Sequence, residues 1–259
     1  MYALIGDIGN TVTKICLLNI KKYSIKKIFF LQSRKLKNNT YIKNEFRSII
    51  GKNKINYFSL FSSVVPKHEA KIRKFLFKSY KINLVEIKNK KIKKIIKVKV
   101  KNKKQVGSDR IANAVSVYKK YKKNCIVLDL GTATTFDVVT KNGIYNGGVI
   151  APGVNLSIKS LSKYADQIPS FSFKKSNKVI GKNTIEALNA GFYWGYVGLI
   201  NNIIFKIEKE TRKKYKILFS GGYADLFKTS IMRSFTVDKN ITINGIIEIF
   251  KHNRNYLIK

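Results

Sequence analysis

Two stretches of the chain share one pattern of apolar and polar positions, and each predicts a β-hairpin. Residues 5–18 read IGDIGNTVTKICLL, and residues 127–139 read VLDLGTATTFDVV. In each, an apolar run is interrupted by an aspartate and a glycine and then resumes, which favours two strands joined by a tight glycine turn. The matching positions are Asp7 with Asp129, Gly9 with Gly131, Asn10 with Thr132, and Thr13 with Thr135. This internal repeat predicts two similar α/β domains, which we place at residues 1–118 and 119–259.

The rest of the pattern alternates between helices and strands. Each hairpin is followed by a further strand, at 21–31 and 144–150. Apolar residues at helical spacing predict helices, and their ranges are 40–52, 67–80, 108–121 and 184–211. A buried strand is expected at 57–66, and residues 216–227 predict a strand, a Gly-Gly turn and a helix. Apolar and basic residues alternate over 94–103, so the lysines there are expected on the exposed face of a strand.

The composition is that of a globular protein, although its charge is extreme. The chain has 259 residues, of which 44% are hydrophobic, and 52 Lys and Arg against 14 Asp and Glu give a net charge of +38. Such a charge can indicate nucleic-acid binding. Here the lysines are scattered along the whole chain, and abundant Lys, Ile, Asn, Tyr and Phe fit AT-rich codons. We therefore expect attraction of anionic substrates and nonspecific, salt-sensitive binding, but no specific nucleic-acid partner.

Two further features bear on the compartment. No apolar run reaches the roughly 18 residues that span a bilayer, so no membrane partner is expected. The N-terminal MYALIGDIGN has no basic region and does not read as a signal peptide. Cys16 and Cys125 lie in apolar strand-like runs without CxxC spacing, which is typical of buried free thiols. We expect a cytoplasmic protein.

The hairpin turns are the first candidate for chemistry. A glycine turn lets backbone N–H groups approach a phosphate closely, and Thr or Asn adds further donors. An aspartate just before the turn can hold a cation bound to the same phosphates. Two matched hairpins indicate such a site more strongly than one, although each is also compatible with an ordinary decorated turn. The sequence FSGGYA at 219–224 supports close approach of a ligand, since its two glycines follow a strand.

The second candidate is VGSDR at 106–110, which opens a predicted helix. An aspartate in the first turn of a helix is commonly a cap. In a phosphoryl-transfer site, however, a carboxylate is needed to orient and deprotonate the accepting hydroxyl. Arg110 beside Asp109 could hold a substrate carboxylate or the transferring phosphoryl group.

Together these motifs resemble the type III pantothenate kinases, also called the Bvg accessory factor family. The matching stretches, in family order, are DIGNTVTK (7–14), VGSDRIANAV (106–115), LDLGTATTFDVV (128–139), YNGGVIAPGV (145–154), GKNTIEALNAGFYWG (181–195) and SGGYA (220–224). The resemblance implies an α/β fold of two similar RNase H-like, actin-like (ASKHA) domains with mixed sheets. It also implies a homodimer with the active site near the dimer interface.

The resemblance implies residue roles as well. Asp109 would be the general base, and Asp129 would bind the monovalent cation, K+ or NH4+, that these enzymes require. Asp7 would lie near Mg2+, and Thr132 would contact ATP. The first phosphate loop would comprise Asp7, Ile8, Gly9, Asn10, Thr11, Val12, Thr13 and Lys14. Pantothenate would meet Gly107, Ser108, Asp109, Arg110 and Thr184.

The chain departs from the family just upstream of VGSDR. Val100 stands where a tyrosine is expected, and Lys103 stands where a proline is expected. Val100 offers no hydrogen bond, so contacts to pantothenate on that side would differ. We expect ATP-dependent phosphorylation of pantothenate to 4′-phosphopantothenate, the first step toward coenzyme A. Two alternatives remain: a noncatalytic regulatory or nucleic-acid-binding protein, and a kinase for another small hydroxylated substrate.

Overall fold

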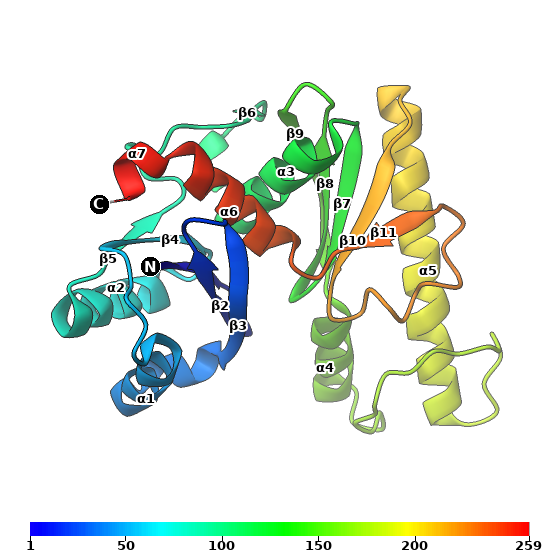
Figure 1. Ribbon diagram of the computed structural model, residues 1–259. Helices are drawn as coiled ribbons and strands as arrows, with labels where there is room; N and C mark the ends of the chain where they lie inside the picture. Colours follow the sequence, from blue (N-terminus) through cyan, green and yellow to red (C-terminus); the bar gives the residue numbers. More distant parts are fainter. Residues whose placement is uncertain (259) are drawn as a thin grey trace. The chain divides into compact units, whose positions relative to one another are not determined.

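The structure is a computed structural model that describes residues 1–258 (Figure 1). The chain forms two compact units. The first comprises Met1–Lys122, Gly143–Tyr145 and the chain from Asn240 onward, and the second comprises Lys123–Asn142 and Asn146–Lys239. The expected division at residues 118 and 119 falls near the end of helix α3 (Ser108–Tyr121). The structure differs from that expectation at the C-terminal end, since residues from Asn240 onward belong to the first unit.

The first unit is built on a mixed five-stranded sheet with the strand order β3-β2-β1-β4-β5. β1 and β2 form the first predicted hairpin, while β4 and β5 run parallel to β1. The elements, including two short 3₁₀ helices η, are β1 (Tyr2–Ile8), β2 (Val12–Asn19), β3 (Ser24–Gln32), η1 (Ser33–Lys37), α1 (Asn39–Ile50), β4 (Phe58–Ser63), α2 (Pro66–Tyr80), β5 (Asn83–Glu86), β6 (Lys97–Val98), η2 (Lys103–Gln105), α3, α6 (Ile241–His252) and α7 (Arg254–Leu257).

Local signals explain the first two helices. α1 begins after Asn38, whose side chain accepts hydrogen bonds from the backbone N–H groups of Thr40 and Tyr41, and ends at Gly51 with a φ of 48°. α2 begins at Pro66, whose missing N–H costs nothing in a first turn. Their apolar faces pack on one side of the sheet in a buried cluster. The predictions of both helices are confirmed.

Helices α3 and α6 pack against each other and against β1 and β4. Gly245 of α6 makes the close approach possible, because a Cβ atom there would lie 2.5 Å from the carbonyl carbon of Ala112 in α3. Two buried polar side chains join the same helices, where Thr242 Oγ1 donates to Asn113 Oδ1 at 2.8 Å. The position of α3 is therefore fixed by backbone contact as well as by side-chain packing.

The second unit contains the second predicted hairpin. Its elements are β7 (Cys125–Leu130), β8 (Ala133–Val139), β9 (Ile144–Pro152), α4 (Val154–Tyr164), α5 (Thr184–Thr211), β10 (Lys216–Gly221) and β11 (Phe235–Val237). The strand order is β11-β10-β7-β8-β9-β6, and β6 pairs only with Ile144 and Tyr145 at the start of β9. β7 and β8 are antiparallel while β10 runs parallel to β7, so this sheet is also mixed.

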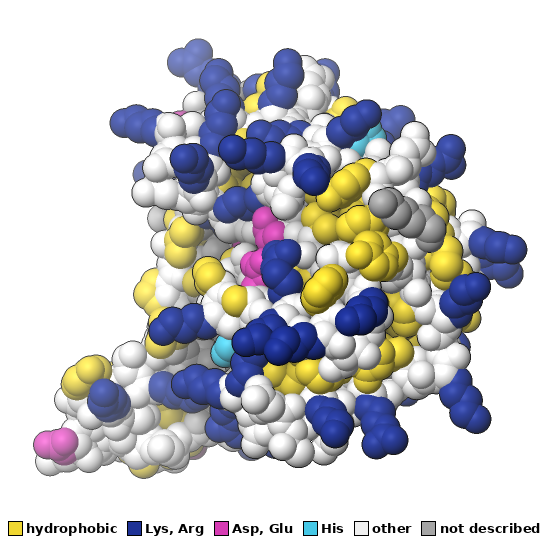
Figure 2. Space-filling model, turned by 90° about the vertical axis from the view of Figure 1, so that its left-hand side faces the viewer, with side chains coloured by type: hydrophobic (Ala, Val, Ile, Leu, Met, Phe, Trp, Pro, Cys, Tyr) yellow, Lys and Arg dark blue, Asp and Glu magenta, His cyan; other side chains and the backbone are white. Residues whose placement is uncertain are grey.

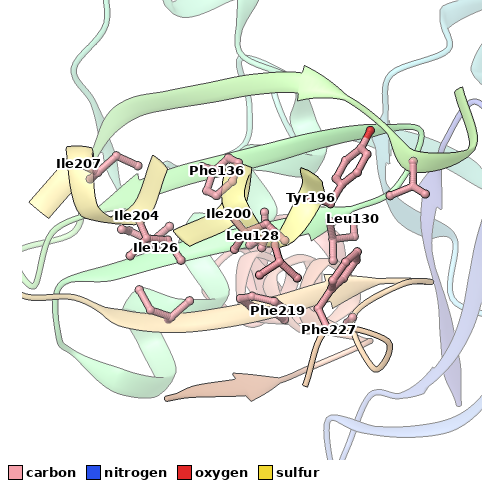
Figure 3. Close-up of a cluster of buried hydrophobic side chains, with 14 of the residues drawn as sticks. Ile126, Leu128, Leu130, Phe136, Tyr196, Ile200, Ile204, Ile207, Phe219 and Phe227 are labelled. Carbon is pink, nitrogen blue, oxygen red and sulfur yellow. The ribbon is translucent and has the colours of Figure 1, made fainter. Parts of the chain in front are cut away.

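One helix covers a face of this second sheet. Alternate residues of β7, beginning with Ile126, point toward α5 and meet Ile200 and Ile204 in a cluster that also includes Phe219 of β10 (Figure 3). Each such side chain contributes about 1.5–3 kcal/mol when fully buried. The prediction of α5 at 184–211 is confirmed, and its apolar character is explained by this burial.

Two expected elements differ in the structure. The helix expected after the Gly-Gly pair is a series of turns, with hydrogen bonds from Leu226 N–H to Tyr223 and from Ser230 N–H to Phe227. Each of these closes over three residues, as in a turn, and α-helical bonding does not propagate. The strand expected over 94–103 is reduced to the two residues of β6, although the lysines at 97, 99 and 101 are exposed as expected.

The basic side chains do not gather on one element. Figure 2 shows Lys and Arg side chains spread over the whole visible face, with a few acidic side chains near its centre. Among residues 1–258, no helix combines the length and the apolar character that crossing a bilayer requires. Cys16 and Cys125 are buried free thiols, as predicted.

Candidate active site

The first hairpin places Asp7 one residue before the end of β1, opposite Lys14 in β2. The turn is closed by a hydrogen bond from the N–H of Gly9 to the carbonyl of Val12 at 3.2 Å. A Cβ atom at Gly9 would lie 2.8 Å from that carbonyl oxygen, so the turn requires glycine. The side chains of Asn10, Thr11 and Val12 are exposed at the tip. This geometry is suitable for an anion, since backbone and polar donors share one exposed turn.

Two residues of the predicted phosphate loop are buried instead. Ile8 is fully buried in the core of the first unit. Thr13 is also fully buried, and its Oγ1 lies 2.9 Å from the hydroxyl of Ser33. These two positions can offer a ligand only their backbone groups, while their contact with nucleotide stays a prediction.

The second hairpin places Asp129 opposite Thr135, and the N–H of Gly131 donates to the carbonyl of Ala133 at 3.1 Å. Two glycines from other segments lie against its backbone. A Cβ atom at Gly153 would lie 2.7 Å from the carbonyl carbon of Thr132, and one at Gly221 would lie 2.5 Å from that of Leu130. Gly221 also has a φ of 89°, which favours glycine. The second hairpin is thus closely packed at its base, while Gly131 and Thr132 remain exposed.

The two hairpins differ by one residue, which corrects one of the predicted matches. Ile8 pairs with Thr13 across the first turn, and Leu130 pairs with Thr134 across the second. The first turn is therefore one residue longer. Thr13 corresponds in position to Thr134, which is also fully buried, rather than to Thr135. The match of the two aspartates is unaffected because both precede the turns.

Residues 107–110 lie at the same sheet edge as the first hairpin. The N–H of Val64, just after β4, donates to the carbonyl of Ile8 at 3.1 Å. Ser108 Oγ lies 3.2 Å from the carbonyl of Ser63, the last residue of β4. The carboxyl ends of the parallel strands β1 and β4 therefore bring Asp7 and the start of α3 to one edge of the first sheet, where ligands bind in many α/β proteins.

Asp109 has the environment of a general base. Its Oδ1 accepts a hydrogen bond from the backbone N–H of Arg110 at 2.8 Å. Burial raises the pKa of Asp109 above its usual value, while the backbone N–H and the charge of Arg110 oppose the rise. A base is more effective as its pKa approaches the working pH. The guanidinium of Arg110 lies 5.8 Å from the ring centre of Tyr145, which holds the arginine beside the aspartate.

The remaining predicted site residues lie elsewhere. Val100 is half-buried and lines a cavity of about 1000 Å³ together with Ile111 and Val115 of α3, and Asp109 is absent from the described lining of that cavity. Thr184 is the exposed first residue of α5. The N–H of Glu186 donates to the side chain of Asn183, so Glu186 takes part in capping this helix. The contacts of Val100 and Thr184 with substrate stay predictions.

The donors near Asp7 are suitable for Mg2+. Ser62 lies beside Asp7 across the β1–β4 pairing, and its buried hydroxyl has no hydrogen-bond partner within the described chain. Among residues 1–258 there is no group of three or more His, Cys, Asp or Glu side chains that could hold a metal ion by itself. Mg2+ is usually bound through one or two carboxylates together with water and phosphate oxygens, so an oxygen set of this size fits it.

Two residues have contacts at the start of α3 that the sequence did not predict. Glu86, the last residue of β5, accepts a hydrogen bond from Ser108 Oγ at 2.6 Å. Lys88 reaches the backbone just before Gly107, where its Nζ donates to the carbonyl of Val106 at 3.0 Å. Neither residue belongs to a recognisable motif, and only the fold brings them to the start of α3.

Comparisons with solved structures identify the fold. The solved structures with similar folds include a conserved Baf family protein from Campylobacter jejuni, with a TM-score of 0.63 and 21% identity, covering 97% of this chain and 99% of that one. They also include the activator of 2-hydroxyisocaproyl-CoA dehydratase from Clostridium difficile with bound ADPNP, with a TM-score of 0.55 and 11% identity over 98% of this chain and 96% of that one. The fold is that of the actin-like ATPases and sugar kinases, as predicted.

Sequence relatives define the family within this class. The profile of the type III pantothenate kinases matches residues 3–206. A type III pantothenate kinase of Pelagibacter ubique is 51% identical over 244 residues, which cover 94% of this chain and 96% of that protein. The chain belongs to the type III pantothenate kinase family, which confirms the resemblance.

Proposed function

We propose that the protein transfers the γ-phosphoryl group of ATP to the terminal hydroxyl of pantothenate. The product is 4′-phosphopantothenate, so the reaction is the first step of coenzyme A biosynthesis. The observation that carries the proposal is a half-buried Asp109 with a raised pKa, held beside Arg110 at the ligand-binding edge of the first sheet. Family membership supports the choice of pantothenate, since the matching relatives carry that name.

The chain's own residues then have the following roles. Asp109 accepts the proton of the pantothenate hydroxyl, whose oxygen forms a bond to the γ-phosphorus as the bond to the bridging oxygen of ADP breaks. Arg110 binds the pantothenate carboxylate or the transferred group. Asp7 and the first turn hold Mg2+ and phosphate oxygens, and bound Mg2+ neutralises charge on the transferring group. Gly107, Ser108, Val100 and Thr184 line the pantothenate site.

The second hairpin has a separate role in the proposal. Thr132 is exposed in its turn and contacts ATP, and Asp129 binds a monovalent cation, K+ or NH4+. A half-buried carboxylate at a strand end is an oxygen donor of the kind that such cations accept. We further propose a cytoplasmic homodimer. Leu156, Leu161 and Tyr164 of α4 leave apolar surface exposed that a second copy could cover.

A nucleic-acid-binding role has no comparable support. A binding surface for DNA or RNA would concentrate basic residues on one face or along one helix. The lysines and arginines are instead spread over the visible face in Figure 2. A retained base, arginine and two strand-end aspartates are also unnecessary for a protein that only binds.

One experiment tests the proposal. Purified protein is incubated with ATP, Mg2+, K+ and pantothenate, and 4′-phosphopantothenate is sought by mass spectrometry. We expect product from the wild type and none above background from Asp109→Asn. Replacing K+ by Na+ should lower the rate through the site at Asp129. ATP turnover on another hydroxylated acid, without turnover on pantothenate, would favour the alternative substrate, and equal product from both proteins would exclude Asp109 as the base.

A further inference from the structure

The end of β5 contacts the segment that carries the proposed base on both sides of one glycine. We define the base loop as residues 104–109. After Gly107, Ser108 Oγ donates to Glu86 Oε1 at 2.6 Å. Before Gly107, Lys88 Nζ donates to the carbonyls of Lys104 at 3.1 Å and Val106 at 3.0 Å. Glu86, at the end of β5, and Lys88, in the turn that follows, thus hold both halves of the loop.

The Glu86 contact is more than incidental packing. Ser108 is 2% exposed, so its hydroxyl needs a partner, and a carboxylate is a stronger acceptor than a carbonyl. The other oxygen, Glu86 Oε2, accepts from the backbone N–H of Lys88 at 2.6 Å. Both carboxylate oxygens are therefore engaged, one by the base loop and one by the turn that carries Lys88. The rigid carboxylate group of Glu86 therefore links the position of Ser108 to the position of Lys88.

The base depends on the glycine between these contacts. A Cβ atom at Gly107 would lie 3.6 Å from Asp109 Cγ and would clash with Oδ1, so the carboxylate folds back directly over Gly107. Any movement of the loop backbone at this point moves the surface on which the carboxylate lies. A shift of only about 1 Å can reduce a catalytic rate 100-fold.

We infer that Glu86 and Lys88 are positioning residues that hold the base loop on both sides of Gly107 and so fix the Asp109 carboxylate. The charge of Lys88 has a second effect, because it opposes the rise that burial causes in the pKa of Asp109. The charged groups near Asp109 are Arg110 and Lys88, and those near Glu86 are Lys88 and Glu69. The inference rests on the proposed function in naming Asp109 as the base, but it can be tested without turnover.

The first test is a titration of the Asp109 carboxyl by carbon NMR, with Asp109→Asn providing the assignment. In Lys88→Met the pKa of Asp109 should rise, because a nearby positive charge is lost. Lys88→Arg should retain the wild-type value, and Lys90→Met, at an exposed lysine in the same turn, should leave it unchanged. An unchanged Asp109 pKa in Lys88→Met would overturn the electrostatic part of the inference, whether or not pantothenate is the substrate.

The second test is kinetic and uses the same variants. Lys88→Met should lower kcat by about 10- to 100-fold with little change in the KM for ATP. The acid limb of its profile of kcat/KM against pH should move to higher pH. A purely structural role for Lys88 would not move that limb. If Lys88→Met turns over as fast as the wild-type protein, the positioning role is refuted. If the wild-type protein itself shows no turnover of pantothenate, the proposed function is refuted instead.

A double-mutant cycle tests the other contact. Glu86→Leu and Ser108→Ala should each lower kcat, and the double variant should be no slower than the slower single variant, because both remove one interaction. Independent, multiplying effects would contradict the inferred coupling. Melting temperatures of all three variants show whether each is folded. If Glu86→Leu is not folded, the surface variant Lys88→Met still tests the positioning of the base loop.

Discussion

Because α6 approaches α3 closely at Gly245, we expect Gly245→Ala to reduce both stability and turnover. In Gly245→Ala, the new methyl group would lie 2.5 Å from the carbonyl carbon of Ala112 and 3.0 Å from its Cα. Carbon atoms in contact are normally about 3.5–4.0 Å apart, so the helices must separate by about 1 Å. The obstructing atoms are backbone atoms, and no side-chain rotation can relieve the clash.

The expected magnitudes follow from this geometry. Overpacking of this kind costs about 1–3 kcal/mol, and we expect the upper end because backbone blocks the methyl group. Alanine recovers about 1 kcal/mol through its higher helix propensity. The net loss of about 2 kcal/mol should lower the melting temperature by about 4–8 °C in a chain of this size. Since α3 carries Asp109, the same displacement should lower kcat by up to about 100-fold.

The matched control is the same substitution in an open position. Gly195 lies in α5, and a Cβ atom there would have no neighbour within 4 Å. Gly195→Ala should therefore raise the melting temperature by about 2–4 °C, which corresponds to about 1 kcal/mol of propensity. Differential scanning fluorimetry and a coupled kinase assay measure both effects. The reasoning is refuted if Gly245→Ala melts and turns over like the wild type, or if both variants shift in the same direction.

Three further predictions concern other parts of the molecule. Burial raises the pKa of Asp109 in the folded state above its value in the unfolded state, so ionisation of Asp109 destabilises the fold as the pH rises from the unfolded pKa through the folded pKa. Asp109→Asn should therefore have a higher melting temperature than the wild type at neutral pH. A difference in melting temperature that does not shrink at acidic pH would contradict this prediction. Gly221→Ala should lose at least about 1–2 kcal/mol of stability at its positive φ and raise the KM for ATP, whereas Gly222→Ala, with open space around its Cβ, should do neither. Burial raises the pKa of Cys16 to about 12 and that of Cys125 to about 11. Neither thiol should therefore react with a disulfide reagent at pH 8 until the protein unfolds. Rapid reaction of either thiol in the folded protein would show that it is not buried.

Local patterns predicted most of the elements and both hairpins. The aspartate and glycine of each hairpin lie within a few residues of each other, and the chain requires glycine at position 9 for a reason that is local. The match of Thr13 with Thr135 failed because identical spacing in sequence does not reveal the number of residues in a turn. Only the strand pairing shows that the first turn is longer.

Long-range packing accounts for the features that the sequence could not predict. Thr242 and Asn113 are 129 positions apart, and nothing local indicates that α6 returns to the first unit. Glu86 and Ser108 are 22 positions apart, and the segment around Glu86 has the pattern of any buried strand end. Residues that act by positioning others carry no motif, because their role depends on the neighbour that the fold supplies.

The return of the chain to the first unit has a consequence for biosynthesis. On the ribosome, every residue of the second unit is made before α6, which covers one side of the first sheet. The first unit therefore cannot complete its fold until α6 has been made, while the second unit can finish folding before that. Until α6 is made, one apolar face of the first unit's sheet stays exposed in the nascent chain. Such a state is prone to aggregation and is a target for chaperones.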